Sequence, residues 1–365
     1  MANLKAPSVT VAFLEQAASA IERGERGVIA MLVVDATAGL ESDYTIYDVT
    51  GIPEELTDAN KLAVKLALKG YVSAPKKILL HVIASADDYD DGLAALATMK
   101  WNYLVCPTAE TDDVVSDIIS WISSQRTAGM TYKAVLPDAA GDNPGIINVT
   151  SSATYNGAEV AAEVVACRVA GIIAGCPLSM SVTYAPLSDF DDCQRLTPAE
   201  LDTAVGAGKL VLMWDGEKVK VCRGVNSFQT TNGTMGDSFK KIKLVEAMDM
   251  IKDDITMTAQ DSYIGKYVNS YDNKLLLVTA INAYFRQLAT EGVLASGLCT
   301  VDVEAQRNYF DSKGGSFVVD GETIRTENAT EQQLKEGNTG SHVFLKATVS
   351  LLDAIEDIDL NIYIG

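Results

Sequence analysis

Hydrophobic residues in the first half of the chain follow two spacings in turn. Short runs that are continuously apolar, or that alternate with polar residues, predict strands, whereas longer stretches with helical spacing of apolar residues predict helices. The expected strands are 28–34, 77–84, 103–106, 133–136 and 146–149, and the expected helices are 56–70, 89–100, 111–126 and 157–175. Strands that alternate with helices in this way predict an α/β domain around a mixed, largely parallel sheet.

The second half of the chain mixes the two spacings without a regular alternation. The expected elements are helices at 198–205, 240–255 and 275–288, a hairpin of 210–214 with 219–223, a strand or helical turn at 301–308 and a strand at 317–319. The hairpin prediction depends on Asp215-Gly216, a dipeptide typical of tight turns. This mixture is typical of an α+β domain.

Both ends of the sequence carry a strict alternation of apolar and polar residues. The apolar positions are Val9, Val11 and Phe13 near the start, alternate residues of 343–351 near the end, and finally Ile358, Leu360, Ile362 and Ile364. Period-two alternation predicts strands with one apolar face. A strand has unpaired backbone groups that need a partner, which is either the subunit's own sheet or another chain, and the pattern leaves both open.

Charge and size narrow the class of protein. The chain has 365 residues, which suggests two or three domains at about 150 residues each. Its 49 acidic and 29 basic residues give a net charge of −20, and its hydrophobic content of 48% indicates a globular protein. Such an acidic surface repels phosphate backbones and anionic lipids, so we expect neither nucleic acid nor a membrane as a partner.

The six cysteines and the absence of a secretion signal indicate synthesis in a cytoplasm. No two cysteines have CxxC spacing, so we expect reduced thiols in the core rather than a disulfide framework. The N-terminus lacks a basic region followed by an uninterrupted apolar run. The most apolar stretch, 160–173, contains Glu163 and Arg168 and is expected to be a buried helix.

A search for catalytic or ligand-binding motifs finds no convincing set of residues. His81 and His342 are the only histidines, and neither has a metal-ligand spacing. The stretch 206–210 resembles a phosphate-binding loop, but Thr203 and Leu210 occupy positions where that motif needs Gly and Ser or Thr. We therefore expect no catalytic residue, no metal site and no cofactor. The alternative is an α/β ligand-binding or enzymatic protein with an unrecognised site.

Several longer stretches together resemble one known family. They are VTVAFLEQAASAIERGERGVIAML (9–32), RVAGIIAGCPLSMSVTYAPL (168–187), RGVNSF (223–228), KKIKLVEAMDMIKDDI (240–255), YIGKYVNSYDNKLLLVTAINAYFRQLATEGVL (263–294) and the terminal segment 343–364. In this order and spacing they resemble the contractile tail sheath proteins of phages and of phage-tail-like particles (bacteriocins) of Gram-positive bacteria. The resemblance covers essentially the whole chain, although no single motif is as specific as a zinc signature.

The resemblance implies a structural role. Sheath subunits polymerise as stacked hexameric rings, helically arranged around a tail tube, and contract to drive the tube through a target cell envelope. The implied partners are further copies of the chain, the inner tail tube protein, and the baseplate and tail terminator proteins. The implied location is a virion or extracellular tail particle, after synthesis and assembly in the cytoplasm of the bacterial host.

The resemblance also implies a division into domains. Residues 1–21 would form an N-terminal strand arm, residues 22–222 an α/β outer domain, and residues 223–365 an α+β C-terminal sheath domain that includes a C-terminal strand arm from about 343 to 365. Adding a terminal strand to a neighbour's sheet is a general way of joining chains through backbone hydrogen bonds.

Particular residues acquire roles from the same resemblance. The arms would donate strands through Val9, Val11 and Phe13 at one end and through Ile358, Leu360, Ile362 and Ile364 at the other. A C-terminal-domain helix contacts the tube in this family, and the charged candidates here are Lys240, Lys241, Lys243, Asp249, Asp253 and Asp254. The alternative for this helix is an ordinary surface helix with separated charges.

Overall fold

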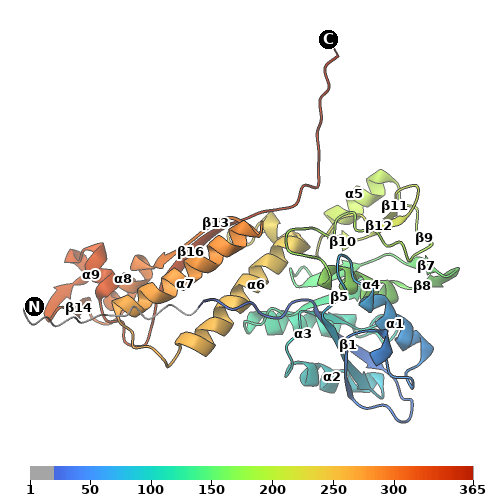
Figure 1. Cartoon of the computed structure of the whole chain (residues 1–365), viewed down its shortest axis with the longest axis horizontal. Coiled ribbons are helices and arrows are strands. Elements are labelled where there is room, and N and C mark those ends of the chain that lie inside the picture. Colours follow the sequence, from blue (N-terminus) through green and yellow to red (C-terminus); the bar gives the residue numbers. More distant parts are fainter. Residues whose placement is uncertain (1–19, 365) are drawn as a thin grey trace, which may run out of the picture. The chain divides into compact units, whose positions relative to one another are not determined.

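A computed structural model of the chain describes residues 20–364. These residues form two compact units (Figure 1). We call the first the sheet unit; it comprises Arg23–Asp254, Glu291–Val293 and the chain from Leu351. We call the second the helix unit; it comprises Ile255–Thr290 and Leu294–Ser350, with residues 20–22. The expected N-terminal arm residues Val9, Val11 and Phe13 lie outside the described residues.

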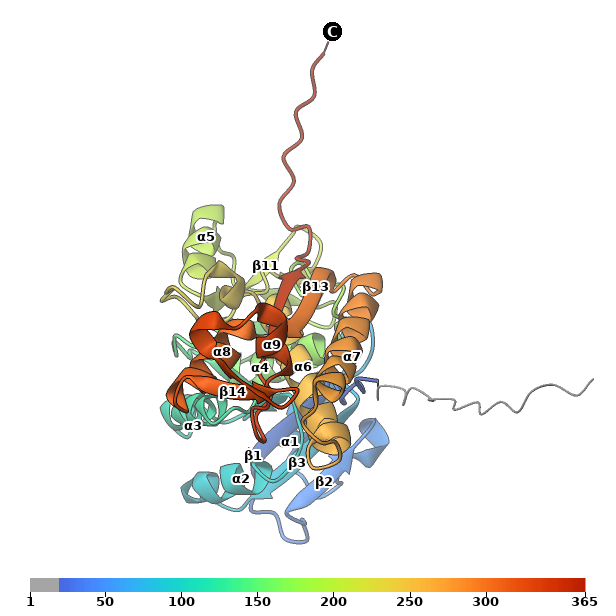
Figure 2. The ribbon, with the colours of Figure 1, turned by 90° about the vertical axis from the view of Figure 1, so that its left-hand side faces the viewer.

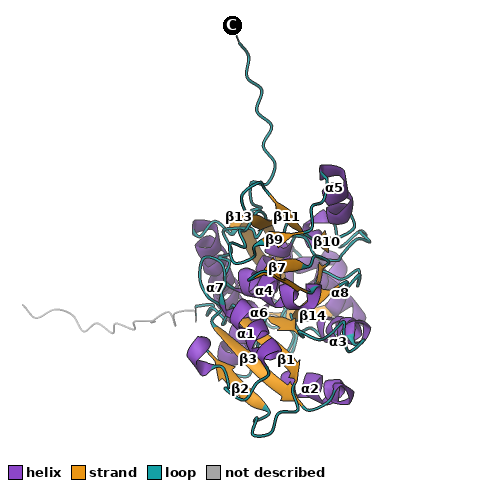
Figure 3. Ribbon diagram, turned by 90° about the vertical axis from the view of Figure 1, so that its right-hand side faces the viewer, coloured by secondary structure: helices purple, strands orange, loops and turns teal. Residues whose placement is uncertain are grey.

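A seven-stranded sheet forms the centre of the sheet unit (Figure 3). Its strands are β1 (Val28–Val34), β2 (Asp43–Ile46), β3 (Lys77–Ile83), β4 (Tyr103–Val105), β5 (Lys133–Pro137), β6 (Ile146–Val149) and β10 (Lys209–Leu210). The order is β10-β6-β5-β4-β1-β3-β2, and only the edge pair β2–β3 is antiparallel. The expected largely parallel sheet is therefore confirmed.

Helices cover both faces of this sheet. Side chains of successive β1 residues point to opposite faces. Ile29 and Met31 pack in one apolar cluster with α1 (Asp58–Leu68) and α4 (Ala162–Ala174). On the other face, Ala30 and Leu32 pack with α2 (Tyr89–Leu96) and α3 (Val115–Thr127). Burial on both faces explains why β1 is apolar without interruption.

Helices α3 and α4 begin four and five residues later than the sequence predicts. Helix α3 begins at Val115 rather than 111, because the preceding chain turns through Asp113, whose φ is +58° and therefore left-handed. Helix α4 begins at Ala162 rather than 157. The residues before it form a hairpin of β7 (Ala153–Tyr155) and β8 (Ala158–Val160), to which β9 (Asp192–Cys193) adds a third strand.

The rest of the sheet unit follows the expected pattern, except that one expected strand is divided into two. Helix α5 (Pro198–Gly206) begins with a capping box between Thr197 and Glu200. The strand expected at 210–214 is divided, because Leu210 belongs to β10 of the large sheet and β11 (Leu212–Trp214) pairs with β12 (Val219–Val221) as the predicted hairpin.

The helix unit contains the following elements (Figure 2): the end of α6 (Ile242–Thr258), α7 (Tyr271–Thr290), β13 (Leu294–Val301), α8 (Val303–Ser312), β14 (Ser316–Val319), β15 (Glu322–Arg325), α9 (Glu331–Glu336) and β16 (Leu345–Leu351). Strands β13 and β16 form a two-stranded sheet, and α7 packs against β13. The side chain of Asn282 on α7 bonds the backbone N–H and C=O of Cys299 on β13. The segment 301–308, which the pattern left as strand or helical turn, begins α8.

Two expectations on chemistry can be compared with the structure. All six cysteines are free thiols; four of them lie in the core as expected, whereas Cys176 and Cys222 are half-buried. Within the described part of the chain, no helix is both long enough and apolar enough to cross a bilayer.

A close contact between α1 and α4 provides a test of the packing. A Cβ atom added at Gly171 would lie 2.1 Å from the carbonyl oxygen of Ala67, so Gly171→Ala forces the two helices apart. We expect this substitution to lower the free energy of unfolding by about 1–3 kcal/mol. The matched control is Gly206→Ala, where the added atom meets nothing within 4 Å. Urea unfolding of the unassembled subunit measures both, and equal effects would contradict the assigned packing.

Candidate assembly site

The C-terminal segment is apolar and exposed. Between Leu352 and Ile364 the described chain forms neither helix nor strand, and the segment after Asp357 extends away from the sheet unit to which it belongs (Figures 1–3). The alternating apolar side chains predicted for the arm are 81% exposed at Ile358, 76% at Leu360, 78% at Ile362 and 97% at Ile364. Contiguous exposed apolar residues mark an interaction site.

The start of this segment is fixed to the sheet unit through Glu356. The Glu356 side chain is only 5% exposed. Its Oε1 accepts hydrogen bonds from the hydroxyls of Ser181 at 3.0 Å and Thr183 at 2.6 Å, and its Oε2 lies 3.1 Å from the ammonium of Lys241. One carboxylate therefore connects the C-terminal segment to two distant parts of the unit.

Two further acidic residues bind the same cations. Lys241 also pairs with Asp353, and Arg223 pairs with Asp357 while its Nε lies 3.8 Å from Glu356. We call Arg223, Lys241, Asp353, Glu356 and Asp357 the C-terminal clasp. Burial alone would lower the pKa of Lys241, but its hydrogen bonds to Asp353 and Glu356 raise the pKa overall. The hydrogen bond from Arg223 lowers the pKa of Asp357, which therefore stays ionised at neutral pH.

A second group of charged residues attaches α6 to the large sheet. Glu246 on α6 is buried and contacts Arg26 at 2.9 Å, Lys133 at 3.2 Å and the hydroxyl of Tyr103. Arg26 precedes β1, Tyr103 begins β4 and Lys133 begins β5, and these three strands are neighbours in the sheet. Helix α6 therefore lies along the amino ends of the central parallel strands.

The same face of α6 continues this network. Asp249 accepts a bidentate pair of hydrogen bonds from Arg126 at 2.8 and 3.0 Å and lies 3.2 Å from Lys133. Asp253 accepts a hydrogen bond from the hydroxyl of Thr131 at 2.5 Å. Spacings of three and four residues put Glu246, Asp249 and Asp253 on one side of the helix. We call this group, with its partners, the α6 network.

The electrostatics of the α6 network depend on Glu246. Burial alone would raise the pKa of Glu246, but the charges of Lys133 and Arg26 and the hydrogen bond from Tyr103 lower it to about 2. Burial and the charge of Glu246 raise the pKa of Tyr103, which therefore stays a neutral donor. Glu246 is thus an ionised carboxylate inside the protein.

The structure places the candidate tube-facing residues in several different environments. Asp249 and Asp253 belong to the α6 network, and Asp254 accepts a hydrogen bond from the backbone N–H of Gly24 at 2.7 Å. Lys241 belongs to the clasp. Lys243 is buried, and desolvation lowers its pKa, while Lys240 is half-buried and pairs with Asp237 at 3.0 Å.

This placement corrects the picture of 240–255 as a surface helix. Both alternatives for this helix assumed exposed charges, whereas Lys243, Asp249 and Asp254 are at most 8% exposed. The reason is that each acidic residue on the inner face finds a partner within the sheet unit. The contact with a tube stays a prediction. Lys252, which the sequence analysis did not select, is an exposed cation on the same helix.

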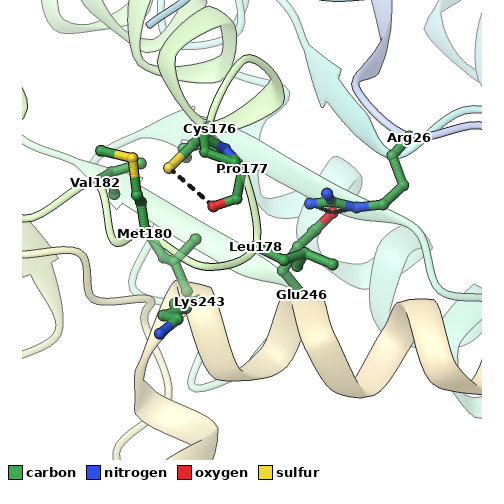
Figure 4. A pocket seen from close by; sticks show the side chains of 10 residues that line it. Arg26, Cys176, Pro177, Leu178, Met180, Val182, Lys243 and Glu246 are labelled. Carbon is green, nitrogen blue, oxygen red and sulfur yellow. Dashed lines mark hydrogen bonds and ion pairs between the residues drawn. The ribbon is translucent and has the colours of Figure 1, made fainter. Parts of the chain in front are cut away.

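The cavities beside α6 are small. Figure 4 shows one between α6 and the loop after α4, where Arg26 and Glu246 point toward one another. It encloses about 20 Å³ and is lined by Cys176, Met180 and Lys243 among others. That volume accommodates about one water molecule. The cavity therefore has no room for an organic ligand.

Two charged groups elsewhere on the sheet unit, Asp35 and Arg168, also have internal partners. Ligands of parallel α/β sheets bind at the carboxyl ends of the strands. There, Asp35 accepts hydrogen bonds from Thr37, Thr57 and Asn60. A surface hollow of about 460 Å³ contains Arg168, whose guanidinium pairs with Asp189 at 2.9 Å. Among the described residues no cluster of three or more His, Cys, Asp or Glu side chains is arranged to hold a metal ion.

Sequence reasoning missed both the clasp and the α6 network. Arg223 and Asp357 are 134 residues apart, and Lys133 and Asp249 are 116 apart, so no local spacing connects them. One signal was available in the sequence. Glu246 interrupts an apolar stretch of a predicted helix, and Lys133 opens a predicted strand, where a charge needs a buried partner.

Comparison with known proteins identifies relatives along nearly the whole chain. Residues 84–227 match the family model of the phage tail sheath protein central domain, and residues 234–365 match that of the phage tail sheath C-terminal domain. The tail sheath protein of Clostridium phage phiCD119 is 33% identical over 362 residues, which cover 97% of this chain and 98% of the relative.

Solved structures show the same fold at low sequence identity. The sheath tail protein from Desulfitobacterium hafniense superimposes with a TM-score of 0.70 at 17% identity, covering 81% of this chain and 94% of its own. The helical sheath of the anti-feeding prophage in its contracted state has a TM-score of 0.69 at 14% identity and covers 99% of each chain.

The α6 network makes a prediction about stability. Replacing Glu246 by Gln leaves Arg26 without its buried counter-charge and removes one of the two buried carboxylates that pair with Lys133. We therefore expect Glu246→Gln to lower the free energy of unfolding by about 3 kcal/mol at neutral pH. The control is Glu200→Gln on α5, because an exposed Gln preserves a capping box and should have little effect. Urea unfolding of the unassembled subunit measures both changes.

The same substitution predicts a change in acid sensitivity. The folded-state pKa of Glu246 is about 2, below the ordinary value of 4.5, so its ionised form stabilises the fold above about pH 4.5. That contribution is lost as the pH falls from 4.5 toward 2. The free energy of unfolding should therefore fall less steeply in this window for Glu246→Gln than for the unmodified chain. Equal slopes would show that folding does not lower the pKa of Glu246.

Proposed function

Because the chain belongs to the phage tail sheath protein family, we propose that it polymerises around a tail tube and contracts to drive the tube through a target cell envelope. The observation that carries this proposal is the 33% identity with a tail sheath protein over 97% of the chain. A match of that extent includes both units and the terminal segment. The energy for contraction would then be stored in the packing between subunits, without a nucleotide or cofactor.

The proposed partners follow from this role. The subunit would contact further copies of itself in stacked hexameric rings with a helical arrangement, the inner tail tube protein, and the baseplate and tail terminator proteins. Synthesis and assembly would take place in the cytoplasm of a bacterial host. The net charge of −20 supports the exclusion of nucleic acid and membrane as partners, because both carry negative charge.

Subunits would be joined through the C-terminal arm. We propose that the alternating residues Ile358, Leu360, Ile362 and Ile364 form a strand that pairs with the sheet of a neighbouring copy, and that Val9, Val11 and Phe13 do the same at the other end. The exposure of the C-terminal set supports this, because pairing would cover one apolar face. Such a contact joins two different surfaces and therefore propagates into rings and helices.

The two-stranded sheet of the helix unit has the properties of an acceptor. Strand β16 is exposed from Lys346 to Ser350, so an added strand could approach it without displacing any covering element of its own unit. On β13, Leu298 is also exposed. Exposed strand edges are usually protected against unwanted pairing, and a strand from a neighbouring subunit that stays bound to the edge would provide such protection.

The finer division into domains stays a prediction. We propose that residues 1–21 form the N-terminal arm, that 22–222 form the α/β outer domain and that 223–365 form the α+β sheath domain with its arm from about 343. The sheet unit extends past residue 222 as far as Asp254. Residues 223–254 of the proposed sheath domain would therefore pack on the α/β sheet.

We propose no catalytic role. An enzyme or ligand-binding protein needs convergent polar groups in a cleft. In the described part of the sheet unit, Asp35 and Arg168 have internal partners, which favours a structural role over the alternative.

Electron microscopy tests the proposed function directly. We expect the purified subunit at high concentration, alone or mixed with a tail tube protein, to form hollow tubes or stacked rings of uniform width in negative stain. Rings with six-fold symmetry would support the hexameric arrangement. A small monodisperse species under both conditions would contradict polymerisation.

Removal of the C-terminal arm tests how the subunits join. Truncation after Asp357 leaves the clasp intact and removes only the exposed alternating residues, so we expect an unchanged melting temperature and no polymers. Two full-length variants distinguish the roles of the two faces of the strand. Leu360→Asp should prevent assembly because it places a charge on the apolar face, and Asn361→Asp on the opposite face should be tolerated. Tubes formed by the truncated subunit would exclude the arm as the connection.

A further inference from the structure

We propose that Arg223 and Lys241 are positioning residues for the C-terminal arm: by holding Glu356 they fix the point and direction at which the arm leaves the subunit. This inference rests on the proposed function of the arm as a donated strand. The clasp would hold the chain just before residue 358 on the subunit. Residues 358–364 would then leave the subunit from a fixed point toward the neighbouring copy.

The pattern of exposure along the segment carries the proposal. Ile355 is 86% exposed and Ile358 is 81% exposed, whereas the side chain of Glu356 between them is 5% exposed. Folded proteins ordinarily show the opposite preference, with the apolar residues buried and the carboxylate in water. An inverted preference of this kind indicates that the apolar residues await another surface and that the carboxylate serves as the attachment.

The receptor for Glu356 is assembled from segments that are far apart in the sequence. Ser181 and Thr183 belong to the loop after α4, Arg223 follows β12, and Lys241 immediately precedes α6. Direct hydrogen bonds join these segments, because Thr183 accepts a hydrogen bond from the backbone N–H of Gly224 at 3.0 Å and Val225 pairs with Lys241 through a backbone bridge. The attachment point is therefore held from several sides.

The clasp shortens the part of the chain that is free to move. The backbone N–H of Leu352 donates a hydrogen bond to the carbonyl oxygen of Val293, and the clasp holds residues 353–357 beyond it. Only the residues after Asp357 then need to be ordered when a strand pair forms. Fewer residues to order means a smaller entropy cost, and a fixed starting point raises the effective concentration of the arm near its acceptor.

A purely structural role for the clasp predicts different results. Arg223 and Lys241 would then stabilise the folded subunit, and their loss would lower its melting temperature and leave assembly of the folded fraction unchanged. A positioning role predicts the reverse, because the clasp holds a peripheral segment. When the clasp opens, Glu356 and the terminal segment that carries it move into water, and the rest of the subunit keeps its packing. This makes the two roles separable.

The first experiment uses the free subunit. Proteinase K should cut the unmodified chain after Asp357, and mass spectrometry should locate no early cut between Leu352 and Asp357. In the double variant Arg223→Ala/Lys241→Ala we expect early cuts to spread into this segment, while Lys240→Ala, a neighbouring lysine paired with Asp237, should keep the original pattern. Identical cleavage of all three proteins would overturn the clasp, whether or not the subunit assembles.

The second experiment measures assembly by light scattering, with electron microscopy of the products. We expect the double variant to need about tenfold more subunit for half-maximal polymerisation, a loss of effective concentration, with a melting temperature equal to that of the Lys240→Ala control. The reversed pair Arg223→Asp/Asp357→Arg should assemble better than Arg223→Asp alone. If the double variant polymerises at the same subunit concentration as the unmodified chain, the inference is overturned and the proposed function stays intact. If no protein of the set forms polymers with or without a tube, the proposed function fails instead.

Discussion

Glu246 is a carboxylate kept away from water. The amino ends of β1 and β5 supply the positive charges that it needs, and the start of β4 supplies a hydroxyl donor. A buried charge is costly unless it is paired and hydrogen-bonded on several sides. The placement of α6 in this structure brings Arg26, Lys133 and Tyr103 to the same carboxylate. The network therefore specifies where α6 lies on the sheet. Because Lys241 immediately precedes this helix, the position of the clasp depends on the same placement.

The parts of the fold that the sequence predicts are those that local spacing encodes. A continuous apolar run identified β1, because a strand buried on both faces must be apolar throughout. The starts of α3 and α4 were misplaced because turns through Asp113 and Asn156 depend on left-handed backbone, which these residues adopt only in a particular context. Strand β13 went unrecognised because its alternation includes Ala295, Ser296 and Gly297. Small residues carry little strand signal.

The candidate site was predictable only in its apolar half. Alternation alone selected Ile358 to Ile364, since an apolar face must be covered by something. The acidic residues of the clasp and of the α6 network were not predicted, because a charged side chain is assumed to be solvated until a structure shows its partners. Asp249 illustrates the difficulty: its partners Arg126 and Lys133 come from the end of one element and the start of another, and no periodicity along the chain brings them together.

The attachment of the C-terminal segment also limits how far a subunit can act. A chain rises by at most about 3.5 Å per residue when fully extended, so the segment from Ile358 to Ile364 reaches roughly 25 Å from the clasp and no farther. Any surface that this segment binds must stay within that radius for as long as both ends hold. Under the proposed strand exchange, the length of this segment would set the largest displacement that two joined subunits can undergo without separating, while they rotate or slide past one another.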